Sequence, residues 1–309
     1  MATRRLAAAL LFLAGCGEQT SPFKQPMKLA GKVVAAETLN AGRVAYLQYC
    51  RACHGDKTDG KGPAAPGLRP PPRDFTQGSF KFAGVLDQKL PRDEDLVRIV
   101  RGGLHGTAMV GWEVPDRKLD EIIQYIKTRS PKWQEDDAVG EPVAVPPDPW
   151  GEARQTQAVE RGKVLYHGFA QCLGCHPAYA TRQYIYDASK ATLGTGTTDF
   201  RTDMYQPEIK DSEYGVKILP PDFLFNELRS IDKGTELHDL YRILVAGVTG
   251  AAMPAWNPVT LPNKEADVYA IAWYVRSLLE LKGTRAADEL RESLAHQAAF
   301  APPPEDVAK

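Results

Sequence analysis

The sequence lacks an excess of charge, lacks a second long apolar run and has few cysteines. Its 38 Lys and Arg residues balance 39 Asp and Glu residues, which does not indicate a nucleic-acid-binding surface. Beyond the N-terminus, no apolar run approaches the length of about 18 residues that would cross a bilayer. Only five cysteines occur among 309 residues, and four of them lie in two short motifs. The abundant glycines and prolines favour helices joined by long, shaped loops.

Those four cysteines belong to one pattern that occurs twice, as Cys50-Arg51-Ala52-Cys53-His54 and Cys172-Leu173-Gly174-Cys175-His176. Cys-x-x-Cys alone is compatible with a thioredoxin-like redox pair, half of a zinc site or part of an iron–sulfur site. However, no βαβ pattern surrounds either motif, and a zinc site would need both halves to converge on one ion. Covalent haem c explains all three side chains at once, because two thiols on one helical turn can bond the two vinyl groups and the next residue can ligate the iron. The sequence therefore predicts two covalently bound haem c groups, attached through Cys50, Cys53, Cys172 and Cys175, with His54 and His176 as iron ligands.

Two methionine-containing loops are candidates for the opposite ligand of each iron. Met109 lies in GGLHGTAMVGW and Met253 in AGVTGAAMPAW, and five positions of these loops match at a constant separation of 144 residues. Such an internal repeat predicts two equivalent sites. A thioether sulfur opposite a histidine is typical of a high-potential electron-transfer iron, so we predict both methionines as ligands. His105 is the alternative ligand at the first site, although its counterpart in the repeat is Thr249.

With these motifs, the chain resembles the class I cytochrome c family, duplicated in tandem as in bacterial dihaem cytochromes c. The resemblance covers residues 37–133 and 154–282 and implies an all-α fold of two haem domains. It also implies that a proline-containing loop, Leu68–Pro72 in the first half and Leu219–Pro221 in the second, offers a backbone carbonyl to the histidine ring. Arg73 either meets a haem propionate or is a solvated loop residue.

Apolar residues at helical spacing, with acidic first turns and terminal glycines, locate the helices. In the first half they are predicted at 39–54, 93–100 and 116–128, and in the second half at 157–176, 236–246 and 264–281. Neither half has an alternating strand pattern of any length.

Three further segments lie outside these helices. Residues 134–153 form an acidic, proline-rich linker that we expect to be extended and semi-rigid. The run 178–217 lengthens the second half and is a lid, a docking surface or an ordered surface loop without a role. Residues 283–309 are predicted as a C-terminal helix and a frayed tail.

Residues 1–15 have the pattern of an export signal. Two arginines precede a short apolar run that ends in Leu13-Ala14-Gly15-Cys16. This resembles a bacterial lipoprotein signal, which predicts acylation of Cys16 and a tether over residues 16–36; an ordinary signal peptide is the alternative. The resemblance places the protein on the periplasmic side of a bacterial membrane, and Gly17 favours the outer membrane over the inner.

Two functions are compatible with these sites. If each iron has six ligands there is no open position for a substrate, which predicts an electron carrier between redox partner proteins such as an oxidase, a reductase or another cytochrome. The alternative is a dihaem enzyme such as a cytochrome c peroxidase, which needs one haem that opens to substrate and an acid–base group nearby. His105 is the candidate for that group, whereas the matched methionine loops favour the carrier.

Overall fold

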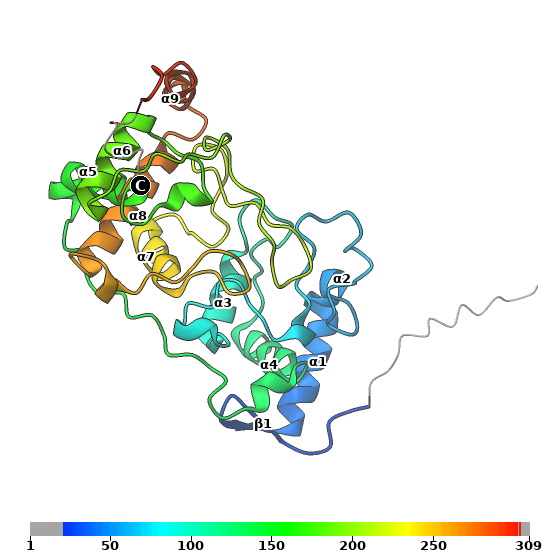
Figure 1. Cartoon of the computed structure of the whole chain (residues 1–309). Helices are drawn as coiled ribbons and strands as arrows, with labels where there is room; N and C mark the ends of the chain where they lie inside the picture. Colours follow the sequence, from blue (N-terminus) through cyan, green and yellow to red (C-terminus); the bar gives the residue numbers. More distant parts are fainter. Residues whose placement is uncertain (1–20, 302, 304–309) are drawn as a thin grey trace, which may run out of the picture.

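The computed structural model describes residues 21–301 and 303, which are mostly helical (Figure 1). The predicted all-α class is confirmed, with one addition: β1 (Met27–Leu29) and β2 (Lys32–Val34) form a small antiparallel hairpin. The helices are α1 (Ala36–Tyr49), α2 (Arg51–His54), α3 (Asp93–Gly102), α4 (Asp116–Lys127), α5 (Gln155–His167), α6 (Arg182–Leu193), α7 (Glu236–Ala246), α8 (Glu265–Glu280) and α9 (Arg285–Ala295). Short 3-10 turns lie at Phe75–Gln77, Leu86–Gln88, Pro131–Gln134, Glu152–Arg154, Cys172–Gly174 and Pro258–Thr260.

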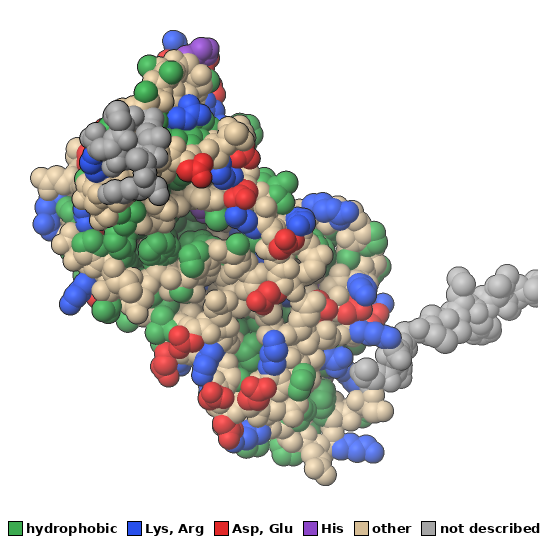
Figure 2. Space-filling view, viewed as in Figure 1, with side chains coloured by type: hydrophobic (Ala, Val, Ile, Leu, Met, Phe, Trp, Pro, Cys, Tyr) green, Lys and Arg blue, Asp and Glu red, His purple; other side chains and the backbone are tan. Residues whose placement is uncertain are grey.

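The predicted signal peptide and Cys16 lie outside the described residues. Within the described part of the chain, no helix is both long enough and apolar enough to cross a membrane. Basic and acidic side chains are interspersed over the face shown in Figure 2, as the balanced composition leads one to expect.

The first and last long helices of each half pack closely at a glycine. α1 lies against α4, and α5 lies against α8 (Figure 1). A Cβ added to Gly42 would lie 1.9 Å from the carbonyl oxygen of Glu121, and one added to Gly162 would lie 1.9 Å from that of Ala270. Only glycine therefore lets the two backbones of each pair approach this closely.

Tyrosine pairs join each helix crossing to the cysteine motif of the same half. The rings of Tyr46 and Tyr125 lie 5.3 Å apart, and those of Tyr166 and Tyr274 lie 5.5 Å apart. The Tyr46 hydroxyl donates to the carbonyl of Gly55 over 2.8 Å, just after the first motif. The Tyr166 hydroxyl donates to the carbonyl of Pro177 over 2.9 Å, just after the second. The two halves thus repeat one packing arrangement that positions the motif relative to the core.

The predicted helix at 157–176 is wrong in its second part, because α5 ends at His167. A Cβ added to Gly168 would lie 2.5 Å from the carbonyl oxygen of Ala188, so α6 packs where a continued helix would need space. Gln171 then adopts a left-handed backbone conformation, with φ of 46°, and turns the chain into the second motif. Helix α6 belongs to the run 178–217 and was not predicted. It contributes to a small third core whose buried members are Leu173, Ala178, Ala180, Ile185 and Met204.

The segments predicted as a tether and a linker pack against the folded halves. Leu29 of the hairpin is fully buried, and the N–H of Ala30 donates to the carbonyl of Trp133 over 2.6 Å. In the linker, the N–H of Val143 donates to Gly84 of the first half over 3.0 Å. Trp273 of α8 donates through Nε1 to Asp148 over 2.9 Å. The linker is therefore fastened at both ends, and it holds the halves side by side with α3 and α7 between them (Figure 1).

Candidate functional site

Both cysteine motifs form a single helical turn. In the first, the N–H of Cys53 and the N–H of His54 donate to the carbonyl of Cys50 over 3.3 and 3.0 Å. In the second, Cys175 and His176 donate to Cys172 over 3.1 and 2.9 Å. All four cysteines are free, half-buried thiols. Each turn therefore presents two thiols and one imidazole from five consecutive residues, which is the donor set that covalent haem c requires.

A backbone carbonyl fixes each of the two histidine rings. Nδ1 of His54 lies 3.0 Å from the carbonyl oxygen of Arg73, and Nδ1 of His176 lies 2.9 Å from that of Pro221. Because a carbonyl oxygen only accepts, Nδ1 carries the proton and Nε2 keeps a free lone pair. Burial lowers the pKa of both rings, which favours the neutral form that can bind a metal. In the second half the carbonyl belongs to Pro221, within the expected loop Leu219–Pro221. In the first half it belongs to Arg73, the residue directly after the expected loop Leu68–Pro72.

A phenylalanine stacks on each histidine ring. Phe75 lies 4.5 Å from His54 with an interplanar angle of 18°, and Phe223 lies 4.9 Å from His176 with an angle of 21°. Each phenylalanine follows an aspartate in an Asp-Phe pair that the sequence repeats. That repeat was the available signal for these two residues, whose contact with the histidines could not be inferred from sequence. Stacking and the carbonyl bond together hold each ring in one orientation.

The two methionine loops have the same main-chain bonds at equivalent positions. The N–H of Leu104 donates to the carbonyl of Met109 over 2.7 Å, and that of Val248 donates to Met253 over 3.2 Å. Both loops begin at a glycine with a positive φ, 74° at Gly103 and 69° at Gly247, directly after α3 and α7. Both methionines are half-buried. The repeat seen in sequence is thus a repeat of backbone geometry, while the role of each sulfur as a ligand stays a prediction.

His105 is held by the second half of the chain. Its Nε2 lies 3.1 Å from a carboxylate oxygen of Asp232, and its main-chain N–H donates to the carbonyl of Arg229 over 2.8 Å. These bonds across the junction give His105 a structural partner. The bonded imidazole is therefore a poor candidate for an iron ligand or for a mobile acid–base group.

The two cysteine motifs do not converge on one metal ion. Among residues 21–301 and 303, no three His, Cys, Asp or Glu side chains come together as a metal-binding group. A shared zinc site, which needs both motifs around one ion, does not fit this arrangement. Haem c fits, since each motif supplies two thiols and one oriented imidazole independently of the other.

The second site has a buried carboxylate that the first lacks. Asp222 follows Pro221 and accepts hydrogen bonds from the hydroxyl of Tyr179 and the N–H of Leu224, each over 3.1 Å. Arg291 of α9 also binds this carboxylate. The equivalent Asp74 is half-exposed and binds only nearby polar groups. The two sites therefore share the carbonyl bond and the phenylalanine that hold the histidine ring. They differ in the aspartate before that phenylalanine, which is buried and paired with an arginine only in the second site.

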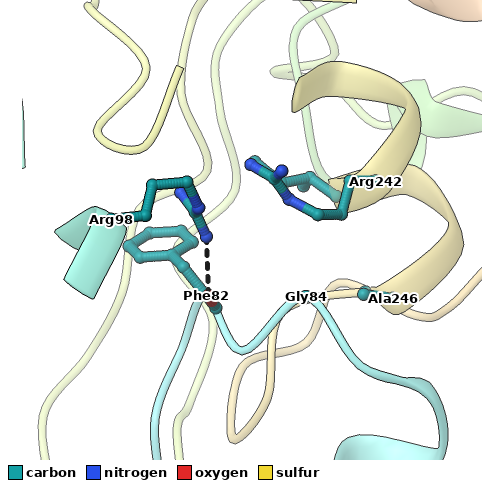
Figure 3. Close-up of a pocket in the computed structure, with 7 residues that line it drawn as sticks. Phe82, Gly84, Arg98, Arg242 and Ala246 are labelled. Carbon is teal, nitrogen blue, oxygen red and sulfur yellow. Dashed lines mark hydrogen bonds between the residues drawn. The ribbon is translucent and has the colours of Figure 1, made fainter. Parts of the chain in front are cut away.

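Two equivalent arginines face one another across a small cavity between the halves (Figure 3). Arg98 of α3 and Arg242 of α7 line it, and Arg98 donates to the carbonyl of Phe82 over 3.2 Å. Each arginine is paired on its own helix, with Asp95 at 3.7 Å and Asp239 at 2.5 Å. The cavity has a volume of about 10 Å³, enough for one water molecule at most and too little for an organic substrate.

Comparisons with known proteins agree with this description. Residues 37–126 match the family described as cytochrome c oxidase, cbb3-type, subunit III. A chain of a reducing HAO-like protein complex from Kuenenia stuttgartiensis has a similar structure, with a TM-score of 0.60 and 24% sequence identity. The likeness covers 77% of the present chain and 96% of that one. A comparison with curated proteins finds no match. The family match includes the first motif and Met109, and the structural likeness extends the shared fold beyond that region.

Proposed function

We propose that this chain, whose residues 37–126 match a cytochrome c family model, transfers electrons through two covalent haem c groups, each ligated by one histidine and one methionine. Haem-based electron transfer is the activity that the family match supports. The second haem rests on one observation: the contacts of His176 with Pro221 and Phe223 repeat those of His54 with Arg73 and Phe75. A motif that had lost its cofactor would have no reason to keep a partly buried imidazole in one fixed orientation.

The residues of each site have distinct tasks in this proposal. Haem c supplies the one-electron iron couple when it is bound. Cys50 and Cys53 in the first half, with Cys172 and Cys175 in the second, attach it covalently. His54 and His176 present Nε2 to the metal, because Nδ1 is engaged with a backbone carbonyl. Met109 and Met253 supply the sulfur ligands, which favour a high reduction potential.

The electron carrier is preferred to the dihaem peroxidase for a geometric reason. A peroxidase needs one site whose distal ligand can leave and a free acid–base group beside it. The loops of Met109 and Met253 instead share one backbone conformation, and His105 is bonded to Asp232. Within residues 21–301 and 303, the two methionine loops therefore give no sign that one site is specialised for a substrate.

The proposed location and partners of the carrier rest on sequence patterns alone. We propose that Cys16 bears a lipid and anchors the protein on the periplasmic side of a bacterial membrane, more specifically the outer membrane. Its partners would be other redox proteins that exchange electrons with the haem groups. Replacing Cys16 with Ser should release the protein from the membrane fraction, and retention of that variant in the membrane would refute the anchor.

Ligation by sulfur is tested by near-infrared spectroscopy of the oxidised protein, where a weak sulfur-to-iron band reports each methionine ligand. Met109→Leu and Met253→Leu should each remove about half of that band, and the double variant should remove all of it. Met204→Leu is a matched control, because Met204 is fully buried in the third core and belongs to neither loop. A band that persists in the double variant, or a high-spin spectrum of the unmodified protein, would contradict the proposed ligands.

A further inference from the structure

A turn of the second half extends to the first half. Residues 210–218 close this turn, because the main-chain N–H groups of Lys210 and Ile218 each donate to the carbonyl of the other residue over 2.9 Å. Tyr214, the middle residue of the turn, is half-buried. The Ser79 hydroxyl of the first half donates to the hydroxyl of Tyr214 over 3.2 Å. The run 178–217 therefore supplies a contact between the halves, which the sequence did not predict.

On the first half, the ring of Tyr214 packs against the residue that holds His54. The guanidinium carbon of Arg73 lies 3.7 Å from the centre of the Tyr214 ring, a cation–π contact. The carbonyl oxygen of Arg73 lies 3.0 Å from Nδ1 of His54. The sequence left open whether the Arg73 side chain meets a haem propionate or water, and in the structure it lies on this ring. Tyr214 therefore holds the side chain of a residue whose main chain orients the first histidine.

On the second half, the same tyrosine contacts the loop that carries Met253. The Tyr214 hydroxyl donates to the carbonyl of Thr249 over 2.5 Å. The N–H of Glu213, the preceding residue, donates to the carbonyl of Gly250 over 3.0 Å. A Cβ added to Gly250 would lie 2.7 Å from the tyrosine ring, so the ring packs directly on the loop backbone. The conformation of the Met253 loop is therefore supported from the turn that reaches the first half.

The Met109 loop has no such contact at the equivalent glycine. Gly106 matches Gly250 in the repeat, and both have a φ of 68°. A Cβ added to Gly106 would have no atom of the described residues within 4 Å, whereas one added to Gly250 would meet Tyr214. The two methionine loops thus share a backbone conformation and differ in what packs on them at this position. The contact with Tyr214 connects the second loop to the first half.

We propose that Tyr214 is a positioning residue shared by both redox sites, through which a displacement at one site changes the other. The inference rests on the proposed function, because His54 and Met253 bear on electron transfer only as iron ligands. Packed side chains and hydrogen bonds that two sites share carry energetic coupling between them. Movement of the Arg73 segment shifts the ring, and the ring holds the Met253 loop at Thr249. Such coupling is reciprocal, so the two reduction potentials are not independent.

The test measures hydrogen exchange of the matured full-length protein by mass spectrometry, in a first peptide covering residues 68–80 and a second covering 247–256. Arg73→Gln removes the cation from the ring and keeps the carbonyl that binds His54. It should speed exchange of the second peptide about three- to tenfold, as expected for the loss of one such contact. In a Tyr214→Leu background it should add nothing there, because the connection is already lost. Tyr214→Phe keeps the ring and should affect the second peptide alone.

Gly250→Ala tests the reverse direction without changing the tyrosine. Its Cβ displaces the ring, so exchange of the first peptide should also rise. Gly106→Ala is the matched control, because it introduces the same backbone strain at the same φ and meets no ring. Tyr205→Leu is the control for Tyr214→Leu: its ring centre lies 6.0 Å from the guanidinium carbon of Arg182 and its hydroxyl donates to the carbonyl of Ala180 over 3.4 Å, all within the second half.

Haem content and midpoint potentials separate this inference from the proposed function. A chain with fewer than two haem groups would contradict the proposed function, whereas hydrogen exchange still reports the contacts of Tyr214. Spectroelectrochemistry gives both potentials, which are assigned with variants that keep only one cysteine motif. Tyr214→Phe should lower the potential of the second site, because a loosened loop weakens the sulfur ligand that favours the reduced iron.

Two results would overturn the proposal. One is an unchanged second peptide in Arg73→Gln. The other is exchange in the Tyr214 variants and in Gly250→Ala that matches the exchange in Tyr205→Leu and Gly106→Ala. An unchanged second potential in Tyr214→Phe would likewise contradict a positioning role.

Discussion

The helix crossing in the second half predicts a large effect from a small substitution, Gly162→Ala. The added Cβ would lie 1.9 Å from the carbonyl oxygen of Ala270, where real Cβ contacts almost never fall below 3.0 Å. Both atoms belong to helix backbones, so α5 and α8 must separate by roughly 1 Å, and the core around Tyr166 and Tyr274 loosens. Overpacking of this kind costs about 1–3 kcal/mol, and the better helix propensity of alanine returns at most about 1 kcal/mol. We expect a net loss of about 1–2 kcal/mol.

The assay is guanidinium unfolding of the matured protein, followed by circular dichroism and analysed as two transitions, because two domains need not unfold together. Gly162→Ala should lower the midpoint of one transition, and Gly42→Ala should lower that of the other. Gly174→Ala is the matched control: no atom lies within 4 Å of its added Cβ, and the first motif has Ala52 there. If Gly162→Ala unfolds at the same concentration as Gly174→Ala, the close crossing is not as described.

Three further predictions concern the second half. Met253→Ala should lower one reduction potential and open that iron to carbon monoxide, so failure to bind carbon monoxide would show that another residue is the ligand. Burial lowers the pKa of His167 from 6.5 to about 3. Its stabilising contribution is therefore complete above pH 6.5 and is lost by about 1.4 kcal/mol per pH unit as the pH falls towards 3. Unfolding measured at stepped pH should show this decline relative to His167→Gln, and equal slopes would contradict it. Arg291→Met should leave Asp222 uncompensated and cost about 1–3 kcal/mol in thermal unfolding, unlike Arg285→Met at an exposed position of the same helix.

Much of the fold was predictable because its signals are local. The periodicity of Leu119, Ile122, Ile123 and Ile126 located α4, and all four residues are buried as that pattern requires. The end of α5 was not predictable from periodicity, because the close contact of Gly168 with Ala188 arises between segments 20 residues apart.

The residues of the candidate sites were easier to predict from the sequence than the contacts around them. The spacing within each motif fixed which side chains share a helical turn, and the repeated loops predicted two equivalent sites. The contacts behind these residues come from distant parts of the chain. His105 and Asp232 are 127 residues apart in the sequence, and Ser79 and Tyr214 are 135 residues apart. Only the packing of one half on the other brings such residues together, and the local sequence carries no signal for these contacts.

The central claim, one covalent haem at each motif, is tested most directly by the intact mass of the matured protein. The account predicts the mass of two haem groups for the unmodified chain. It predicts one for Cys50→Ala/Cys53→Ala, one for Cys172→Ala/Cys175→Ala and none when all four cysteines are replaced. A colourless chain, a zinc-containing chain, or a chain in which one of the two paired variants retains the mass of both haem groups would contradict the account.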